Sequence, residues 1–205
     1  MNYEAGTAIY QILKDYDFGD IKKKDLKVIV EDKLESIYGI SLSQDYYSHT
    51  IRDDGALLLV SVDHEPKLLN LVDKVKELYS GRITINQILP DEVVLMSMLR
   101  VNYDLEPNSI TAVVKFSKNI CRVIFFKGNN LFLVPAVIPE GTDSRRFLNT
   151  VFSKILFQLD TGEVPNLDRL VIADNTLGEA SIKFFKERLP DIDVSEFKLK
   201  TELLE

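Results

Sequence analysis

The sequence predicts a mixed α/β fold in which a βββαβαβ subdomain follows a smaller α/β region. Two observations support this prediction. Three apolar, β-branched runs (residues 110–116, 120–126 and 131–138) follow one another with only short polar breaks. A segment with a wide apolar stripe at helical spacing, residues 144–160, comes directly after them. The loop at Glu106-Pro107-Asn108 separates this unit from the preceding chain, so we expect domains at 1–107 and 108–205.

The first 107 residues are predicted to contain helices and a few strands. Residues 8–16 could form a short helix that Phe18-Gly19-Asp20 ends, and residues 25–38 show helical spacing up to Gly39. The turn Asp53-Asp54-Gly55 is expected to join two strands. The elements predicted around and after it are strands at 45–51 and 56–62, a helix at 65–79, a strand at 82–88, and a helix from Pro90 to about residue 101.

The second region is predicted to complete a three-layer α/β subdomain. Pro135 suits an edge strand, because proline cannot donate to a central ladder. Asp143 is a candidate N-cap for the helix 144–160, and Thr176 with Glu179 forms a T-x-x-E capping box. The remaining elements are a buried parallel strand at 167–173, a helix at 178–189 and a last strand at 191–197. This order is that of a ribonuclease H-like, or actin-like, subdomain.

Composition narrows the possible functions. The 205 residues are 45% hydrophobic and 28% charged, with a formal net charge of −7, as expected of a soluble globular protein. Nucleic-acid binding normally needs a basic face, so the acidic balance argues against it. No apolar run approaches bilayer length and no leader pattern is seen, so we expect a cytoplasmic protein without direct membrane insertion. Cys121 is the single cysteine, which excludes an internal disulfide and a cysteine metal cluster.

The turn after the first strand of the βββ unit is where this fold performs chemistry. Nucleases of this fold hold two divalent cations with carboxylates, and actin-like ATPases use a D-x-G turn for Mg²⁺ and phosphate. Here Lys115 occupies the Asp position and Ser117 the Gly position, followed by Lys118 and Asn119. Cations repel magnesium, although Lys115 and Lys118 could attract an anion. As exposed residues beside a hairpin, they are more often simply solvated.

A second nucleotide element of the superfamily is a Gly-Gly turn after the fourth strand. Asp174 and Asn175 stand there instead, and they could contact a ligand or simply form the turn into the next helix. His49 and His64 lack metal-ligand spacing, and Cys121 lies in a core-type strand. We therefore predict no catalytic residue, metal or cofactor. The weak candidates for an anion or nucleotide are Lys115, Ser117, Lys118, Asn119, Asp174 and Asn175.

From residue 55 to residue 197 the chain resembles PilM-type proteins of type IV pilus assembly and the related GspL-like cytoplasmic domains of type II secretion. An apolar strand before a helix, an N-Y-x-x-E-P-like loop and a hairpin followed by an I-P-x-G segment occur in that family in this order. The matching residues here are Asn102-Tyr103, Glu106-Pro107, Lys127-Gly128 and Ile138-Pro139-Glu140-Gly141.

The resemblance implies an actin-like fold, with residues 1–107 as part of one subdomain. It further implies a platform role at the inner membrane, ATP binding, and a grip on the cytoplasmic tail of a bitopic membrane protein. The chain departs from the family because no first subdomain precedes residue 25 and the D-x-G residues are lost. We therefore predict a non-catalytic scaffold, a pseudo-ATPase acting through protein–protein contacts. The alternatives are an ATPase, with ATP and Mg²⁺, whose cleft needs a missing N-terminal part, and an adaptor in an unrelated process.

Overall fold

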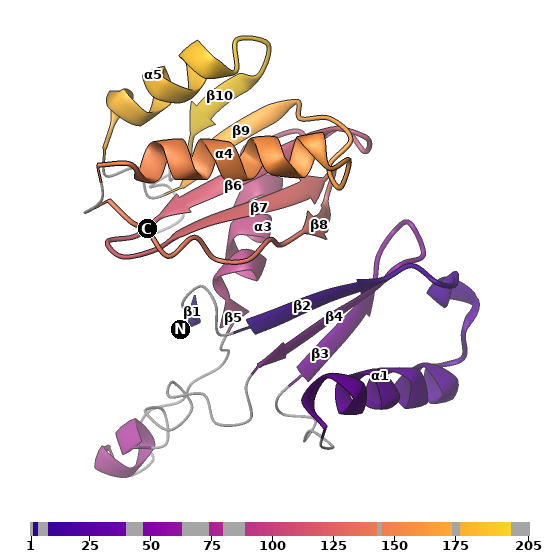
Figure 1. The fold of residues 1–205 in the computed structure, drawn as a ribbon. Coiled ribbons are helices and arrows are strands. Elements are labelled where there is room, and N and C mark those ends of the chain that lie inside the picture. The colour runs from indigo at the N-terminus through magenta and orange to yellow at the C-terminus, as the bar shows by residue number, and fades with distance from the viewer. Residues whose placement is uncertain are drawn as a thin grey trace. The chain divides into compact units, whose positions relative to one another are not determined.

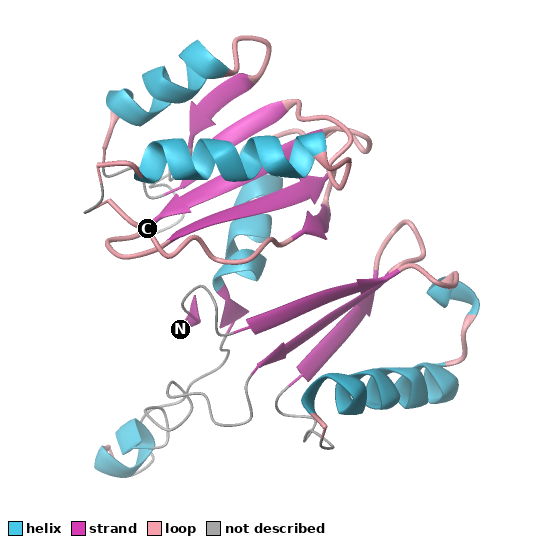
Figure 2. Cartoon of the chain, in the orientation of Figure 1, coloured by secondary structure: helices cyan, strands magenta, loops and turns pink. Residues whose placement is uncertain are grey.

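The computed structural model describes residues 2–3, 8–39, 47–62, 74–79, 89–142, 145–173 and 177–197 (Figures 1 and 2). The chain forms two compact units, unit 1 (residues 1–91) and unit 2 (residues 92–205). Among the described helices, none is long and apolar enough to cross a membrane.

Unit 1 contains a three-stranded antiparallel sheet of order β2-β4-β3 and one long helix. Residues 74–78 are also helical. A separate pair, β1 with β5, is parallel. The elements are β1 (Asn2–Tyr3), β2 (Ala8–Leu13), a 3₁₀ turn (Phe18–Asp20), α1 (Lys23–Tyr38), β3 (Tyr47–Ile51), β4 (Leu57–Val62) and β5 (Leu89–Pro90).

The core of unit 1 lies between α1 and one face of this sheet. Leu26, Val30 and Leu34 recur at helical spacing along α1, and all three are buried. They pack against Leu57 and Leu59, which point to the same face of β4 because they are two residues apart. The predicted helix at 25–38 and the strands at 45–51 and 56–62 are therefore confirmed, with ends shifted by one or two residues.

The short helix considered at residues 8–16 is wrong. Residues 8–13 form β2, which pairs antiparallel with β4 in continuous register from Ala8↔Val62 to Leu13↔Leu57. A segment of six residues is too short for apolar spacing to separate helix from strand, and pairing with a central strand decides. The predicted strand at 82–88 and the start of the helix at 65–79 lie outside the described residues.

Unit 2 confirms the βββαβαβ order. Its five-stranded sheet has the order β10-β9-β6-β7-β8, with β6 in the centre. β6 runs antiparallel to β7 and parallel to β9. The elements are α3 (Asp91–Asn102), β6 (Ile110–Phe116), β7 (Cys121–Lys127), β8 (Asn130–Leu133), α4 (Phe147–Asp160), β9 (Arg169–Ala173), α5 (Glu179–Arg188) and β10 (Asp193–Glu196).

Helices cover both faces of this sheet (Figure 1). Alternate residues of β6 and β7, among them Val114 and Val123, pack in one cluster with Val151 of α4 and Phe185 of α5. The residues between them point to the other face, where Arg122 of β7 meets Glu92 of α3. The result is a three-layer arrangement, with α4 and α5 on one side and α3 on the other.

Several predicted ends in unit 2 need correction. α4 begins at Phe147 and its N-cap is Arg146, with no side-chain cap bond, so the helix does not start at residue 144. Gly178 is the N-cap of α5, again without a side-chain bond. The expected cap residues Asp143 and Thr176 lie outside the described residues. β8 ends at Leu133, and Ile138 then forms an isolated bridge to Cys121. β8 is an edge strand, as Pro135 predicted.

Along the chain, unit 2 begins at residue 92, near the start of α3, whereas the sequence analysis placed a boundary after residue 107. Two contacts fix α3 to unit 2. Glu92 pairs with Arg122, and the guanidinium Nη2 of Arg100 donates to Asn129 O at 2.6 Å. Both partners lie on the β7–β8 hairpin, so the helix and the sheet form one body.

Candidate functional site

The two strands that precede the segments singled out from the sequence, β6 and β9, end at the same edge of the unit 2 sheet. β6 and β9 are parallel neighbours, and Lys115 lies opposite Ala173 near the carboxyl ends of both strands. The carboxyl ends of β6 and β9 therefore lie side by side. Ligands of open α/β sheets bind at such carboxyl ends. Asp174 and Asn175, which follow β9, lie outside the described residues.

The turn after β6 is closed by backbone hydrogen bonds. Ser117 N–H donates to Ile120 O at 2.9 Å, and Ser117 O accepts from Thr142 N–H at 3.1 Å. Lys118 and Asn119 form the exposed tip. A glycine at position 117 would let backbone N–H groups approach a phosphate, but here the Ser117 N–H is already used within the hairpin.

Residues 138–142, which we call the strap, lie against this turn. Cys121 and Ile138 exchange two backbone hydrogen bonds, each of 3.0 Å. A Cβ added at Gly141 would lie 2.2 Å from Lys118 O and 2.4 Å from Ser117 O, so only glycine fits there without movement. Downstream, Thr150 Oγ1 of α4 donates to Glu140 Oε2 at 3.1 Å. The strap thus holds the turn in one conformation.

Cationic side chains stand where a magnesium site would need carboxylates. Lys115 is the cross-strand partner of Arg122. The Arg122 guanidinium lies 2.7 Å from Glu92, and both side chains are buried. Among the described residues, no group of three histidine, cysteine or acidic side chains could hold a metal ion.

Cys121, the first residue after the turn, is unsuited to nucleophilic chemistry. Its side chain is buried, and burial raises the pKa of the thiol from 9.0 to about 11. A hydrogen bond with the Ser117 backbone acts in the opposite direction, and the nearby Glu140 carboxylate adds to the increase. The thiolate is the reactive form of cysteine, so a thiol with this pKa is inert near neutral pH. Its role is packing.

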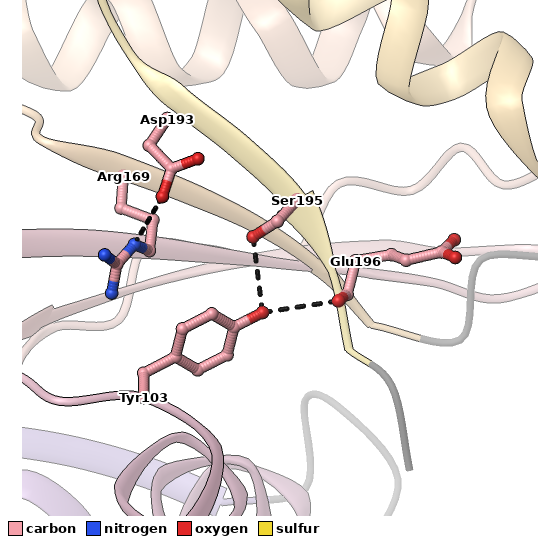
Figure 3. Close-up of polar contacts among 5 residues, drawn as sticks. All are labelled: Tyr103, Arg169, Asp193, Ser195 and Glu196. Carbon is pink, nitrogen blue, oxygen red and sulfur yellow. Dashed lines mark hydrogen bonds and ion pairs between the residues drawn. The ribbon is translucent and has the colours of Figure 1, made fainter.

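A polar cluster around Tyr103 joins the end of α3 to the far edge of the sheet (Figure 3). The Tyr103 hydroxyl lies 3.2 Å from Ser195 Oγ and donates to Glu196 O at 3.3 Å. The Arg169 guanidinium stacks over the Tyr103 ring, 5.0 Å from its centroid, and Arg169 Nε donates to Asp193 Oδ2 at 2.9 Å. These residues satisfy one another, so the cluster is a structural clamp.

The other residues on which the family resemblance rests also lie where elements of unit 2 contact one another. A Cβ at Gly128, whose φ is +50°, would lie 3.0 Å from the Pro107 backbone, and Gly128 N–H donates to Ser109 O at 2.9 Å. Pro107 therefore packs directly on the β7–β8 turn. The motif residues Tyr103, Pro107, Gly128 and Gly141 hold elements of unit 2 together, which explains how the fold persists without the D-x-G residues.

A pocket in unit 1 was not predicted from the sequence. Its volume is about 390 Å³, and it is lined by Lys23 and Lys27 of α1 and by Tyr47, Ser48 and His49 of β3. His49 is exposed, as expected of a surface histidine. Neither lysine stands out in the sequence, because the proximity of α1 to β3 depends on tertiary packing.

Comparisons with known proteins support the fold. No family model matches the sequence, and no curated protein matches it. A structure of the PilM-PilN type IV pilus biogenesis complex matches with a TM-score of 0.64 at 9% identity, over 98% of this chain and 72% of that chain. A protein of unknown function with an actin-like ATPase fold from Bacteroides thetaiotaomicron matches with a TM-score of 0.49 at 11% identity, over 91% of this chain. This chain spans 64% of the length of that protein. The chain has an actin-like ATPase fold.

Proposed function

We propose that this chain is a non-catalytic, actin-like scaffold that makes protein–protein contacts in a pilus or secretion platform. One observation carries the proposal: Lys115 lies near the end of β6, where the ATPases of this fold need a carboxylate, and its cross-strand partner on β7 is Arg122, another cation. Divalent cations are held by oxygen ligands and repelled by ammonium and guanidinium groups. The strap and the closed turn also support the proposal, because the Ser117 N–H is directed into the hairpin.

The proposed partner is the cytoplasmic tail of a bitopic membrane protein. The similar PilM structure was solved as a complex with PilN, which supports a role in holding a protein partner. The chain would then act in the cytoplasm, held at the inner membrane through that partner.

A pull-down with N-terminal cytoplasmic tails of candidate bitopic proteins tests the scaffold directly. The full chain is immobilised, and each tail is presented as a synthetic peptide beside a scrambled peptide of the same composition. Retention of one tail over its scramble supports the proposal. If no tail from the pilus or secretion operons is retained, the platform role is wrong.

Calorimetric titration with ATP–Mg²⁺ tests whether the chain has a nucleotide-binding site. The scaffold proposal expects no saturable heat. A useful control compares Lys118→Ala, at the tip of the candidate turn, with Lys183→Ala on α5, whose side chain is 78% exposed. ATP binding of micromolar strength that Lys118→Ala weakens and Lys183→Ala leaves intact would contradict a scaffold without a nucleotide site.

The alternative function is an actin-like ATPase whose cleft is completed by residues outside this chain. The observation in its favour is that β6 and β9 end at one sheet edge, with Lys115 opposite Ala173. Saturable binding of ATP–Mg²⁺ by this chain in the titration above would favour this alternative over the scaffold. An adaptor in an unrelated process is the third candidate, and finding genes for pilus or secretion components next to the gene for this chain would argue against it.

A further inference from the structure

β3 presents an outer edge that no other strand of the described chain pairs with. It is the end strand of the order β2-β4-β3. Arg52 N–H donates to Ala56 O at 2.8 Å, and hydrogen-bonded pairs recur at every second residue of an antiparallel ladder. Ser48 and Thr50 therefore face β4, while Tyr47 and His49 direct their backbone N–H and C=O groups outward.

The side chains beside this edge carry positive charge. Paired residues of β3 and β4 share a face, so the partners Tyr47↔Ser61 and His49↔Leu59 place Tyr47 and His49 on the α1 side. There the pocket of about 390 Å³ opens between β3 and the first turns of α1, lined by Lys23 and Lys27. Lys27 also pairs with Glu31 at 3.6 Å, so Lys23 contributes most of the unbalanced charge. The chain as a whole carries −7, which makes a basic strand edge notable.

We propose that β3 binds an extended, acidic segment of a partner protein as an added strand. This inference deepens the proposed scaffold function and rests on it. The backbone groups of Tyr47 and His49 would bind the main chain of the segment, whatever its sequence. Side chains opposite these two residues would point to α1, where the lysines favour carboxylates. The preferred segment therefore has acidic residues two positions apart, because only alternate residues of a strand share a face.

A second copy of this chain is the other candidate occupant. Two β3 edges could pair with each other, but that pairing brings two basic edges together and joins two chains of net charge −7. Sedimentation velocity decides between the two. A dimer that His49→Pro converts to a monomer would overturn the proposal of an acidic partner segment.

The test uses fluorescence anisotropy with a labelled peptide of sequence TETETVT and the full chain. Its matched control is TTEETVT, which has the same composition but places the two glutamates on opposite faces of a strand. We expect saturable binding of TETETVT and affinity about tenfold lower for TTEETVT. Equal binding of both peptides, or of neither, would overturn the proposed recognition.

Two variants of the chain locate the binding surface. His49→Pro removes one outward N–H on an edge strand, where proline is tolerated, and should abolish binding of TETETVT. Lys23→Glu combined with Lys27→Gln should weaken it about tenfold, since rim charges tune such contacts. Lys24→Glu, on the same helix but not lining the pocket, should change it little. Far-UV circular dichroism confirms that each variant is folded.

The outcome also separates this inference from the proposed function. If a bitopic tail is retained in the pull-down and His49→Pro retains it equally, the scaffold stands and the β3 site is wrong. If no tail is retained but TETETVT binds in a His49-dependent manner, the β3 site stands and the platform role is wrong.

Discussion

Glu92 on α3 and Arg122 on β7 form an ion pair of 2.7 Å, with exposed fractions of only 3% and 6%. Removing one partner of a buried pair leaves an uncompensated charge in a low-dielectric site. We therefore expect Glu92→Gln to lower the free energy of unfolding by about 3 kcal/mol. Urea unfolding followed by circular dichroism measures this loss.

The matched control is Glu187→Gln, since Glu187 pairs with Lys183 at 3.9 Å on the exposed face of α5. Exposed pairs of this kind contribute little, so the change should stay below about 0.5 kcal/mol. Replacing Glu92 and Arg122 together by leucine should recover most of the lost stability. A Glu92→Gln variant as stable as the control would show that the pair is not buried in solution.

Gly141 is predicted to be intolerant of any side chain. A Cβ there would lie 2.2 Å from Lys118 O, and that neighbour is backbone, which cannot rotate away. Gly141→Ala should lower the stability of the chain by about 2 kcal/mol, the range seen for overpacking. Differential scanning calorimetry detects this as a lower Tm.

Gly162→Ala serves as the comparison, because it has φ +75° and no atom within 4 Å of an added Cβ. This variant should lower the free energy of unfolding by only about 1 kcal/mol, the strain of placing alanine in the left-handed backbone region. If both variants lose the same stability, the close approach of the strap to the turn is not rigid.

The hydroxyl and the ring of Tyr103 should make separate contributions to the free energy of unfolding. Tyr103→Phe removes the contacts with Ser195 Oγ and Glu196 O and keeps the ring between Arg169 and Phe197. We expect a loss of about 1 kcal/mol, the usual net value of a hydrogen bond. Tyr103→Ala should lose more.

Hydrogen exchange read by mass spectrometry shows where this loss acts. Amides of β10 should exchange faster in Tyr103→Phe, whereas those of α1, in unit 1, should keep their rates. Faster exchange throughout the chain would mean that the hydroxyl supports the whole fold and does not act as a local clamp.

The Cys121 thiol gives a pH-dependent prediction. Its pKa is raised from 9.0 in the unfolded chain to about 11 by burial, so folding favours the protonated thiol. The resulting stabilisation is complete below pH 9.0 and is lost as the pH rises towards about 11. Urea unfolding at several pH values should show this decline in the wild type, and Cys121→Ala should lack that component.

Thiol labelling provides an independent check. The chain has one cysteine, so a disulfide reagent at pH 8 reports on Cys121 alone. The folded chain should react far more slowly than the chain in urea. Equal rates would contradict the burial of this side chain.

The sequence predicted those parts of the fold that local pattern determines. β6 was expected at residues 110–116 and lies at Ile110–Phe116, because its apolar run is bounded by polar residues at both ends. α1 was expected from its 3.6-residue spacing. The helix predicted at residues 8–16 was wrong because the six mostly apolar residues 8–13 suit a helix or a strand equally well. Pairing with β4 decides that they form a strand. The start predicted for α4 at residue 144 was wrong, because the helix begins at Phe147 and its N-cap Arg146 makes no side-chain bond.

The candidate site was predictable in part. Lys115 and Ser117 could be aligned with a known turn, so the absence of its Asp and Gly residues was visible from the sequence alone. The ion pair of Glu92 with Arg122 was not, because it depends on which face of α3 meets the sheet. The pocket at β3 likewise needs the packing of α1, since Lys23 and His49 are distant in sequence. Long-range contacts of this kind leave no local signal.

The position of β6 in the sheet has a consequence for how the chain folds. Its antiparallel partner β7 follows after a short turn, so this hairpin can form early, while its parallel partner β9 arrives only after α4. Tyr103 meets its partners 92 and 93 residues later in the chain. During synthesis one side of β6 therefore remains unpaired until β9 has emerged, and the sheet is complete only when β10 adds to β9. The clamp closes last and marks the completion of unit 2.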